Sequence, residues 1–107
     1  MKGIWNVRAI KEDPLFNVDV LSAETDEKEM SLELPRGLVD LSDWRSLEVT
    51  VSRDEGDGDI VMKGVVYKCD EGRLEVSIHG LWLRMATDDC DEFSEGDEVY
   101  IVVRRID

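Results

Sequence analysis

Two acidic segments are the first places in this sequence where side-chain types and spacing suggest chemistry. Asp54–Asp59 alternates carboxylates with glycines, and Asp88–Glu92 places carboxylates around Cys90. Clustered carboxylates bind calcium or magnesium, but a calcium loop needs oxygen ligands at alternating positions, a glycine sixth, and a glutamate six residues later. Gly56 and Gly58 stand where carboxylates are needed, and no helical pattern flanks the loop. We therefore expect two solvated surface loops and no metal.

The single histidine, His79, is the only residue that suggests acid–base catalysis. A nucleophile needs a positioned base and a third orienting group, and one histidine among scattered serines does not supply them. The glycines near Asp57 do not connect a strand to a helix, so they do not predict a phosphate-binding loop. We expect His79 to lie at the surface or in an interface, with no catalytic residue, cofactor or small-molecule ligand.

Cys69 and Cys90 are the only cysteines, and they form neither a C-x-x-C pair nor a metal-ligand spacing. Met1–Asn6 lacks the apolar stretch of a signal peptide, and no apolar run approaches the roughly 20 residues that cross a bilayer. We therefore expect a cytoplasmic protein with no membrane contact, in which both cysteines are free thiols.

Length and composition favour one globular domain spanning residues 1–107, with 42% hydrophobic and 36% charged residues. The net charge is −13, from 26 acidic and 13 basic residues. Phosphate backbones are repelled by such a surface, because nucleic-acid affinity depends largely on Lys and Arg. The charge favours solubility or a basic protein partner.

Apolar and polar residues alternate along the chain with the period of two that half-buried strands show. Gly64 indicates a bulge or bend, Asp70–Arg73 a hairpin turn, and His79-Gly80 a reversal or bulge. Together these signals predict an all-β fold, a small antiparallel barrel of about eight strands, with at most a short helical turn near residues 38–44. The segments expected to be strands are Gly3–Ile10, Phe16–Leu21 (Phe16, Val18 and Val20 alternating with Asn17, Asp19 and Leu21), Met30–Leu34, Leu47–Val51, Ile60–Cys69, Leu74–Ile78, Leu81–Met85 and Val99–Arg104.

The last strands present a candidate binding surface. If Leu81, Leu83 and Met85 point inward, then Trp82 and Arg84 point outward. The same alternation puts Val99, Ile101 and Val103 inside and leaves Tyr100, Val102 and Arg104 outside. Exposed Trp, Tyr and Arg are the composition of binding hot spots. The alternative is that Trp82 covers a barrel end or packs beneath a loop.

A nucleic-acid-binding face is disfavoured on the second and third strands. Oligonucleotide-binding barrels place aromatic and basic residues there. Here those strands carry Asp19, Glu24, Glu29 and Glu33, with Phe16 as the only aromatic residue. Basic residues collect later in the chain, at Lys63, Lys68, Arg73, Arg84, Arg104 and Arg105.

Three late segments resemble the eighth subunit of archaeal and eukaryotic DNA-dependent RNA polymerases. They are Val66-Tyr67-Lys68, the Gly-Leu-x-x-Arg pattern of Gly80–Met85, and the apolar run Val99–Arg105 that ends in paired basic residues. His79 stands where that family often has a second glycine. Ile4–Ile10 and Met30–Leu34 are similar to its first and third strands. Without the long mid-chain loop of the eukaryotic members, the chain looks more like the archaeal form.

The resemblance implies an eight-stranded barrel related to the oligonucleotide-binding fold that docks on the largest catalytic subunit without active-site residues of its own. It implies a cytoplasmic protein that is nucleoid-associated through the polymerase and meets nucleic acid only indirectly. A stand-alone single-stranded nucleic-acid-binding domain and an unrelated small adaptor barrel are the alternatives. The candidate partner-interface residues are His79, Gly80, Trp82, Arg84, Tyr100 and Arg104.

Overall fold

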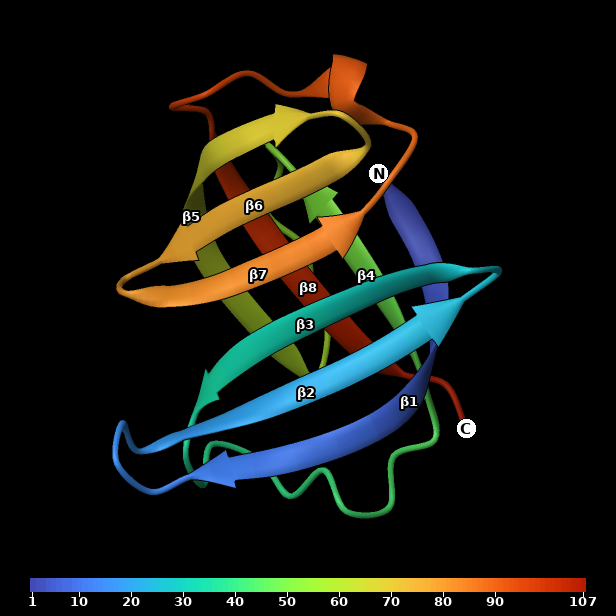
Figure 1. The fold of residues 1–107 in the computed structure, drawn as a ribbon, viewed down its shortest axis with the longest axis vertical. Helices are drawn as coiled ribbons and strands as arrows, with labels where there is room; N and C mark the ends of the chain where they lie inside the picture. Colours follow the sequence, from blue (N-terminus) through green and yellow to red (C-terminus); the bar gives the residue numbers. More distant parts are fainter.

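Eight strands form a closed antiparallel barrel (Figure 1). The computed structural model describes residues 1–107. The strands are β1 (Lys2–Asp13), β2 (Val18–Thr25), β3 (Lys28–Pro35), β4 (Ser46–Ser52), β5 (Ile60–Asp70), β6 (Arg73–Ile78), β7 (Leu81–Ala86) and β8 (Glu98–Arg105). Around the barrel the order is β1-β2-β3-β7-β6-β5-β8-β4, and β4 pairs with β1 to close it. The expected all-β class and barrel of about eight strands are confirmed.

The inside of the barrel holds one apolar core, built from alternate residues of the strands. Each fully buried aliphatic side chain favours folding by roughly 1.5–3 kcal/mol. Leu81, also expected to point inward, is partly buried and packs against this core. The other inward positions expected on β4, β7 and β8 are at most 1% exposed: Leu47, Val49, Val51, Leu83, Met85, Val99, Ile101 and Val103.

The second strand differs from the prediction. It begins at Val18, so Phe16 lies in the preceding turn, where it is 71% exposed. Asp13 Oδ1 accepts a hydrogen bond from the backbone N–H of Phe16 at 3.3 Å, which holds this residue out of the β ladder. Val18, Leu21 and Ala23 are the buried residues of β2, and Leu21 and Ala23 belong to the core cluster. The alternation that grouped Leu21 with polar positions is therefore wrong.

Three two-residue turns join neighbouring strands, and all their residues have positive φ. Left-handed geometry at both positions matches the twist of the flanking strands, which makes these turns well suited to hairpins. The hairpin expected at Asp70–Arg73 is confirmed, and His79-Gly80 is a reversal rather than a bulge. The turns are Asp26-Glu27, Glu71-Gly72 and His79-Gly80.

Helical structure is confined to one 3₁₀ turn, η1 (Cys90–Glu92), in the connection between β7 and β8. Residues 38–44, where a short helical turn was allowed, form turns and bends instead. No helix in the structure has the length and apolar composition needed to cross a bilayer.

Gly64 lies where β5 changes partners. Residues up to Val65 pair with β8, and those from Val65 onward pair with β6. A Cβ at Gly64 would lie 2.7 Å from the backbone oxygen of Ser77, so the two strands approach too closely for any side chain. Gly64 thus marks the close approach of β5 to β6 where the strand changes partners, while the bulge in this strand lies further on, between Val66 and Lys68.

Candidate protein-docking surface

The six candidate interface residues divide between two parts of the barrel wall. His79, Gly80, Trp82 and Arg84 belong to β7 and the turn before it, whereas Tyr100 and Arg104 belong to β8. β6 and β5 separate β7 from β8 in the barrel. Any surface that joins the two groups must therefore include the outward residues of β5.

Trp82 lies half-buried on the outer wall, between side chains from two strands. The Arg84 guanidinium carbon lies 5.0 Å from the centroid of the Trp82 ring, a cation–π distance. The Tyr67 ring meets it edge-on, with centroids 5.3 Å apart and planes at 83°. The backbone N–H of Trp82 donates to Glu33 Oε1 at 3.0 Å. These contacts place Trp82 on the wall of the barrel, with its aromatic neighbour supplied by β5.

Tyr67 is the residue that the sequence reasoning missed. It is 60% exposed, and Val61 and Val65 on the same strand are each 43% exposed. The alternation of β5 places Val61 and Val65 outside. The same alternation places Lys63 and Tyr67 outside, and the bulge between Val66 and Lys68 leaves Lys68 exposed as well and returns Cys69 toward the core. The alternation that exposes Tyr67 was therefore visible in the sequence, since Tyr67 lies two positions after Val65.

Tyr100 continues this surface onto β8. It pairs with Lys63 of β5, whose Nζ lies 5.7 Å from the centroid of the Tyr100 ring. Lys63 also forms an ion pair with Glu98 at 3.6 Å. We call the resulting band, which crosses β8, β5, β6 and β7, the outer stripe. Its members are Lys63, Val65, Tyr67, Trp82, Arg84 and Tyr100.

Arg104 and Val102 are engaged by the acidic loop that precedes β5. Arg104 donates from Nη2 to the backbone oxygen of Asp57 at 2.9 Å. A Cβ at Gly58 would lie 2.6 Å from Val102 Cγ1, and Val102 is only 8% exposed. The expectation that Val102 is open on the outer face is therefore wrong, because this loop covers it.

The second acidic segment follows β7 and has basic partners. Asp88 pairs with Lys28 Nζ at 2.6 Å, and this hydrogen bond is the main reason that the pKa of Lys28 is raised. Asp97, which follows this segment, accepts hydrogen bonds from the backbone N–H of Ser94 at 2.8 Å and from Arg53 Nη2 at 2.6 Å. These bonds lower its pKa. No group of three or more His, Cys, Asp or Glu residues is arranged to hold a metal ion.

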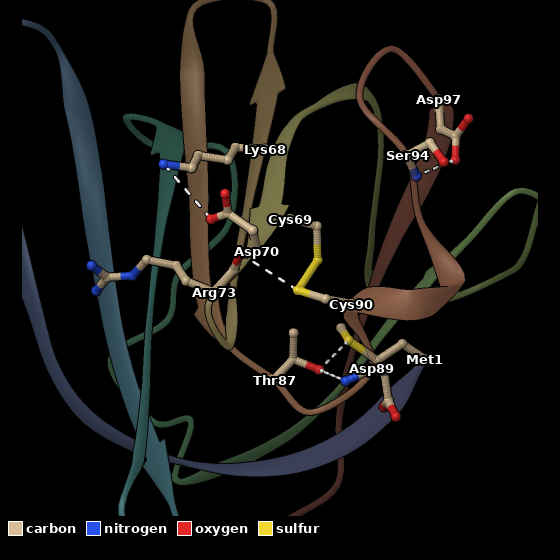
Figure 2. Close-up of a disulfide and its surroundings, with 10 residues drawn as sticks. All are labelled: Met1, Lys68, Cys69, Asp70, Arg73, Thr87, Asp89, Cys90, Ser94 and Asp97. Atoms are coloured by element: carbon tan, nitrogen blue, oxygen red, sulfur yellow. Dashed lines mark hydrogen bonds and ion pairs between the residues drawn. A yellow bond between two sulfur atoms is a disulfide. The ribbon is translucent and has the colours of Figure 1, made fainter.

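Cys69 and Cys90 form a disulfide, so the expectation of two free thiols is wrong (Figure 2). Their Cα atoms are 5.3 Å apart although 21 positions separate them in the chain. The β5–β6–β7 meander folds the chain back on itself, and the N–H of Thr87 donates to Gly72 O at 2.9 Å. Cys90 therefore returns to the end of β5, a proximity that cysteine spacing alone does not reveal.

Taken together, the fold and the outer stripe define a small closed antiparallel barrel whose wall carries aromatic and basic side chains suited to protein binding. No known family model matches the chain. No curated protein matches it either.

Proposed function

We propose that this chain is a non-catalytic structural subunit of a DNA-dependent RNA polymerase of the archaeal kind, and that it supports assembly and transcription. It docks on the largest catalytic subunit through the outer stripe. One observation carries the proposal: the three late segments that resemble the eighth subunit of these polymerases supply Tyr67, Trp82 with Arg84, and Tyr100 to one surface.

The chemistry of the outer stripe supports protein binding. Aromatic and Arg side chains dominate the energetics of many interfaces, because they bury large areas and retain polar groups for orientation. Tyr67 and Trp82 already support each other at 5.3 Å, so a partner meets side chains that have lost part of their freedom before binding. Arg84 carries a positive charge beside Trp82, which favours a partner carboxylate opposite it.

The proposed location is the cytoplasm, with nucleoid association through the polymerase. The Cys69–Cys90 disulfide bears on this point, because disulfides are rare in the reducing cytosol of most organisms. Intracellular proteins of hyperthermophilic archaea are the known exception. The proposal therefore favours an archaeal host of that kind over a mesophilic one.

The test is recovery with the polymerase. A C-terminally tagged chain is purified from its native cells, and the proposal expects the largest polymerase subunit among the recovered proteins. The variant Trp82→Ala/Arg84→Ala is expected to reduce that recovery about tenfold or more, as loss of a hot spot does. The matched control is Ile4→Ala/Lys2→Ala, which removes an exposed apolar and a basic side chain on β1. Absence of polymerase subunits with the wild-type chain would refute the proposal.

A second candidate function is single-stranded nucleic-acid binding, and a groove on the outer face of β1–β3, β6 and β7 favours it. The sequence predicted a hostile acidic surface there. The groove, of about 350 Å³, is instead lined by Arg8, Lys11, Arg73 and Arg84 together with Ser22 and Ser31. Arg8 is paired with Glu29 at 2.8 Å. Salt-dependent binding of a labelled oligonucleotide by the isolated chain, followed by fluorescence anisotropy, would establish this function; affinity indistinguishable from zero at low salt would exclude it.

A further inference from the structure

The turn between β1 and β2 presents the two most exposed large apolar side chains of the protein. Leu15 is 82% exposed and Phe16 is 71% exposed. Leu38, in the loop after β3, is 53% exposed. None of these residues belongs to the outer stripe. Large apolar side chains that gather at the surface indicate an interaction site, whereas single scattered ones do not.

Hydrogen bonds and two conformationally restricted residues hold the β1–β2 turn in the shape that exposes these side chains. Asp13 Oδ1 accepts from the backbone N–H groups of Leu15 and Phe16, at 3.1 and 3.3 Å. Pro14 restricts φ at the start of the turn, and Asn17 takes the left-handed conformation that asparagine tolerates, with φ of 56°. A turn ordered before binding loses little entropy when a partner covers it.

The loop after β3 is tied to this turn. The N–H of Arg36 donates to Asn17 O at 3.1 Å, and the Arg36 guanidinium pairs with Glu12 at 3.3 Å. The N–H of Gly37 donates to Asp19 Oδ2 at 3.3 Å. These bonds hold the start of the loop after β3 against the β1–β2 turn, and both segments lie at the lower left of Figure 1. We call Leu15, Phe16 and Leu38 the tip surface.

A pocket of about 680 Å³ opens beside the tip surface, between β1 and the loop after β3. Ile10, Leu41 and Trp44 supply much of its apolar lining. Its carboxylates are Glu12, Asp19 and Asp40, and its one basic residue is Arg36. The long side chain of a Lys or Arg suits this combination, because its aliphatic part packs on apolar groups while its charge meets carboxylates.

We infer that this end of the barrel is a second protein-docking surface. It receives a segment of the partner that offers an apolar socket to Leu15 and Phe16 and a Lys or Arg side chain to the pocket. The partner is the largest polymerase subunit, so the inference rests on the proposed function. Charge complementarity favours this occupant: a second copy would bring another net charge of −13 and the same carboxylates, and anionic lipid would be repelled likewise.

The test is binding of the purified chain to a polymerase core assembled without it, measured by biolayer interferometry. The triple variant Leu15→Ser/Phe16→Ser/Leu38→Ser is expected to bind at least about tenfold more weakly, as loss of interface anchors does. These side chains are mostly exposed, so the thermal unfolding midpoint should stay close to that of the wild type. The matched control is Ile4→Ser, a 57% exposed side chain on β1 that is expected to leave the affinity unchanged.

Reversing a pocket charge gives a second readout. The single variant Asp40→Lys is also expected to bind the polymerase core more weakly than the wild-type chain, because the new lysine would repel the partner's basic side chain. Tighter binding by this variant would overturn the inferred chemistry of the partner.

The remaining outcomes separate the two proposals. Wild-type affinity in the triple variant would overturn the docking role of the tip surface and leave the proposed function standing. Failure of the wild-type chain to bind the core would overturn the proposed function and this inference with it. A wild-type dimer in sedimentation experiments that the triple variant abolishes would show that a second copy occupies the surface instead.

Discussion

Breaking the disulfide between Cys69 and Cys90 should destabilise the barrel through its effect on the unfolded chain. The bond closes a loop of 21 positions, and both half-cystines are only partly buried. In the chain-entropy treatment, a loop of about this length costs the unfolded state about 11 cal/mol/K, or about 3 kcal/mol near 25 °C. The reduced protein should therefore be less stable by about that amount.

Urea unfolding with and without reductant measures this effect directly. The free energy of unfolding of a small protein falls by roughly 1–3 kcal/mol for each molar increase in urea. The loss of stability on reduction therefore corresponds to a decrease in the urea midpoint of about 1–3 M. The variant Cys69→Ser/Cys90→Ser is the control. It should unfold at the urea midpoint of the reduced wild type, and that midpoint should not change when reductant is added. The native fold should persist in both, since the closed barrel and its apolar core do not depend on the disulfide.

Two results would refute this reasoning. One is a wild-type midpoint that does not change with reductant. The other is alkylation of both cysteines in the native protein before any reductant is added, which would restore the sequence-based interpretation of free thiols.

Two further predictions concern the corner of β5 and the connection before β8. Gly64→Ala should lower the free energy of unfolding by about 1–3 kcal/mol in denaturant titrations, because its methyl group would lie 2.7 Å from Ser77 O; an unchanged midpoint would show that the corner is wider than described. Hydrogen bonds from the Ser94 N–H and from Arg53 lower the pKa of Asp97 below its ordinary value of 3.8. As the pH falls, the unfolded state therefore binds a proton at Asp97 before the folded state does. The contribution of Asp97 to stability is present above pH 3.8 and decreases as the pH falls through the lower pKa of the folded state. In a pH series of unfolding midpoints, wild type should exceed Asp97→Asn near neutrality and approach it in acid; a gap independent of pH would contradict this.

The sequence alone determined the features that depend on neighbouring residues. Apolar alternation in Leu47–Val51 and Val99–Val103 specifies which side chains enter the core, because successive side chains in a strand point to opposite faces. Glu71-Gly72 and His79-Gly80 specify tight reversals, since glycine accepts the left-handed conformation that such turns require. The same local logic placed Trp82 and Arg84 outside.

Local alternation is less informative where a side chain accepts hydrogen bonds from nearby backbone groups, or where a strand is irregular. Asp13 captures two backbone N–H groups and delays the start of β2, which the apolar pattern around Phe16 conceals. A bulge between Val66 and Lys68 shifts the alternation of β5, so that Lys68 is exposed and Cys69 packs against the core. Both effects depend on the geometry of hydrogen bonds, and amino-acid composition does not encode that geometry.

Only the tertiary structure decided which distant segments meet. The pairing of β5 with β8, the return of Cys90 to Cys69 and the link from Arg36 to Asn17 join residues far apart in the chain. The physical reason is that barrel closure depends on the register of all eight strands at once. The sequence marks the inner and outer faces of most strands, and closure decides which outer faces become neighbours.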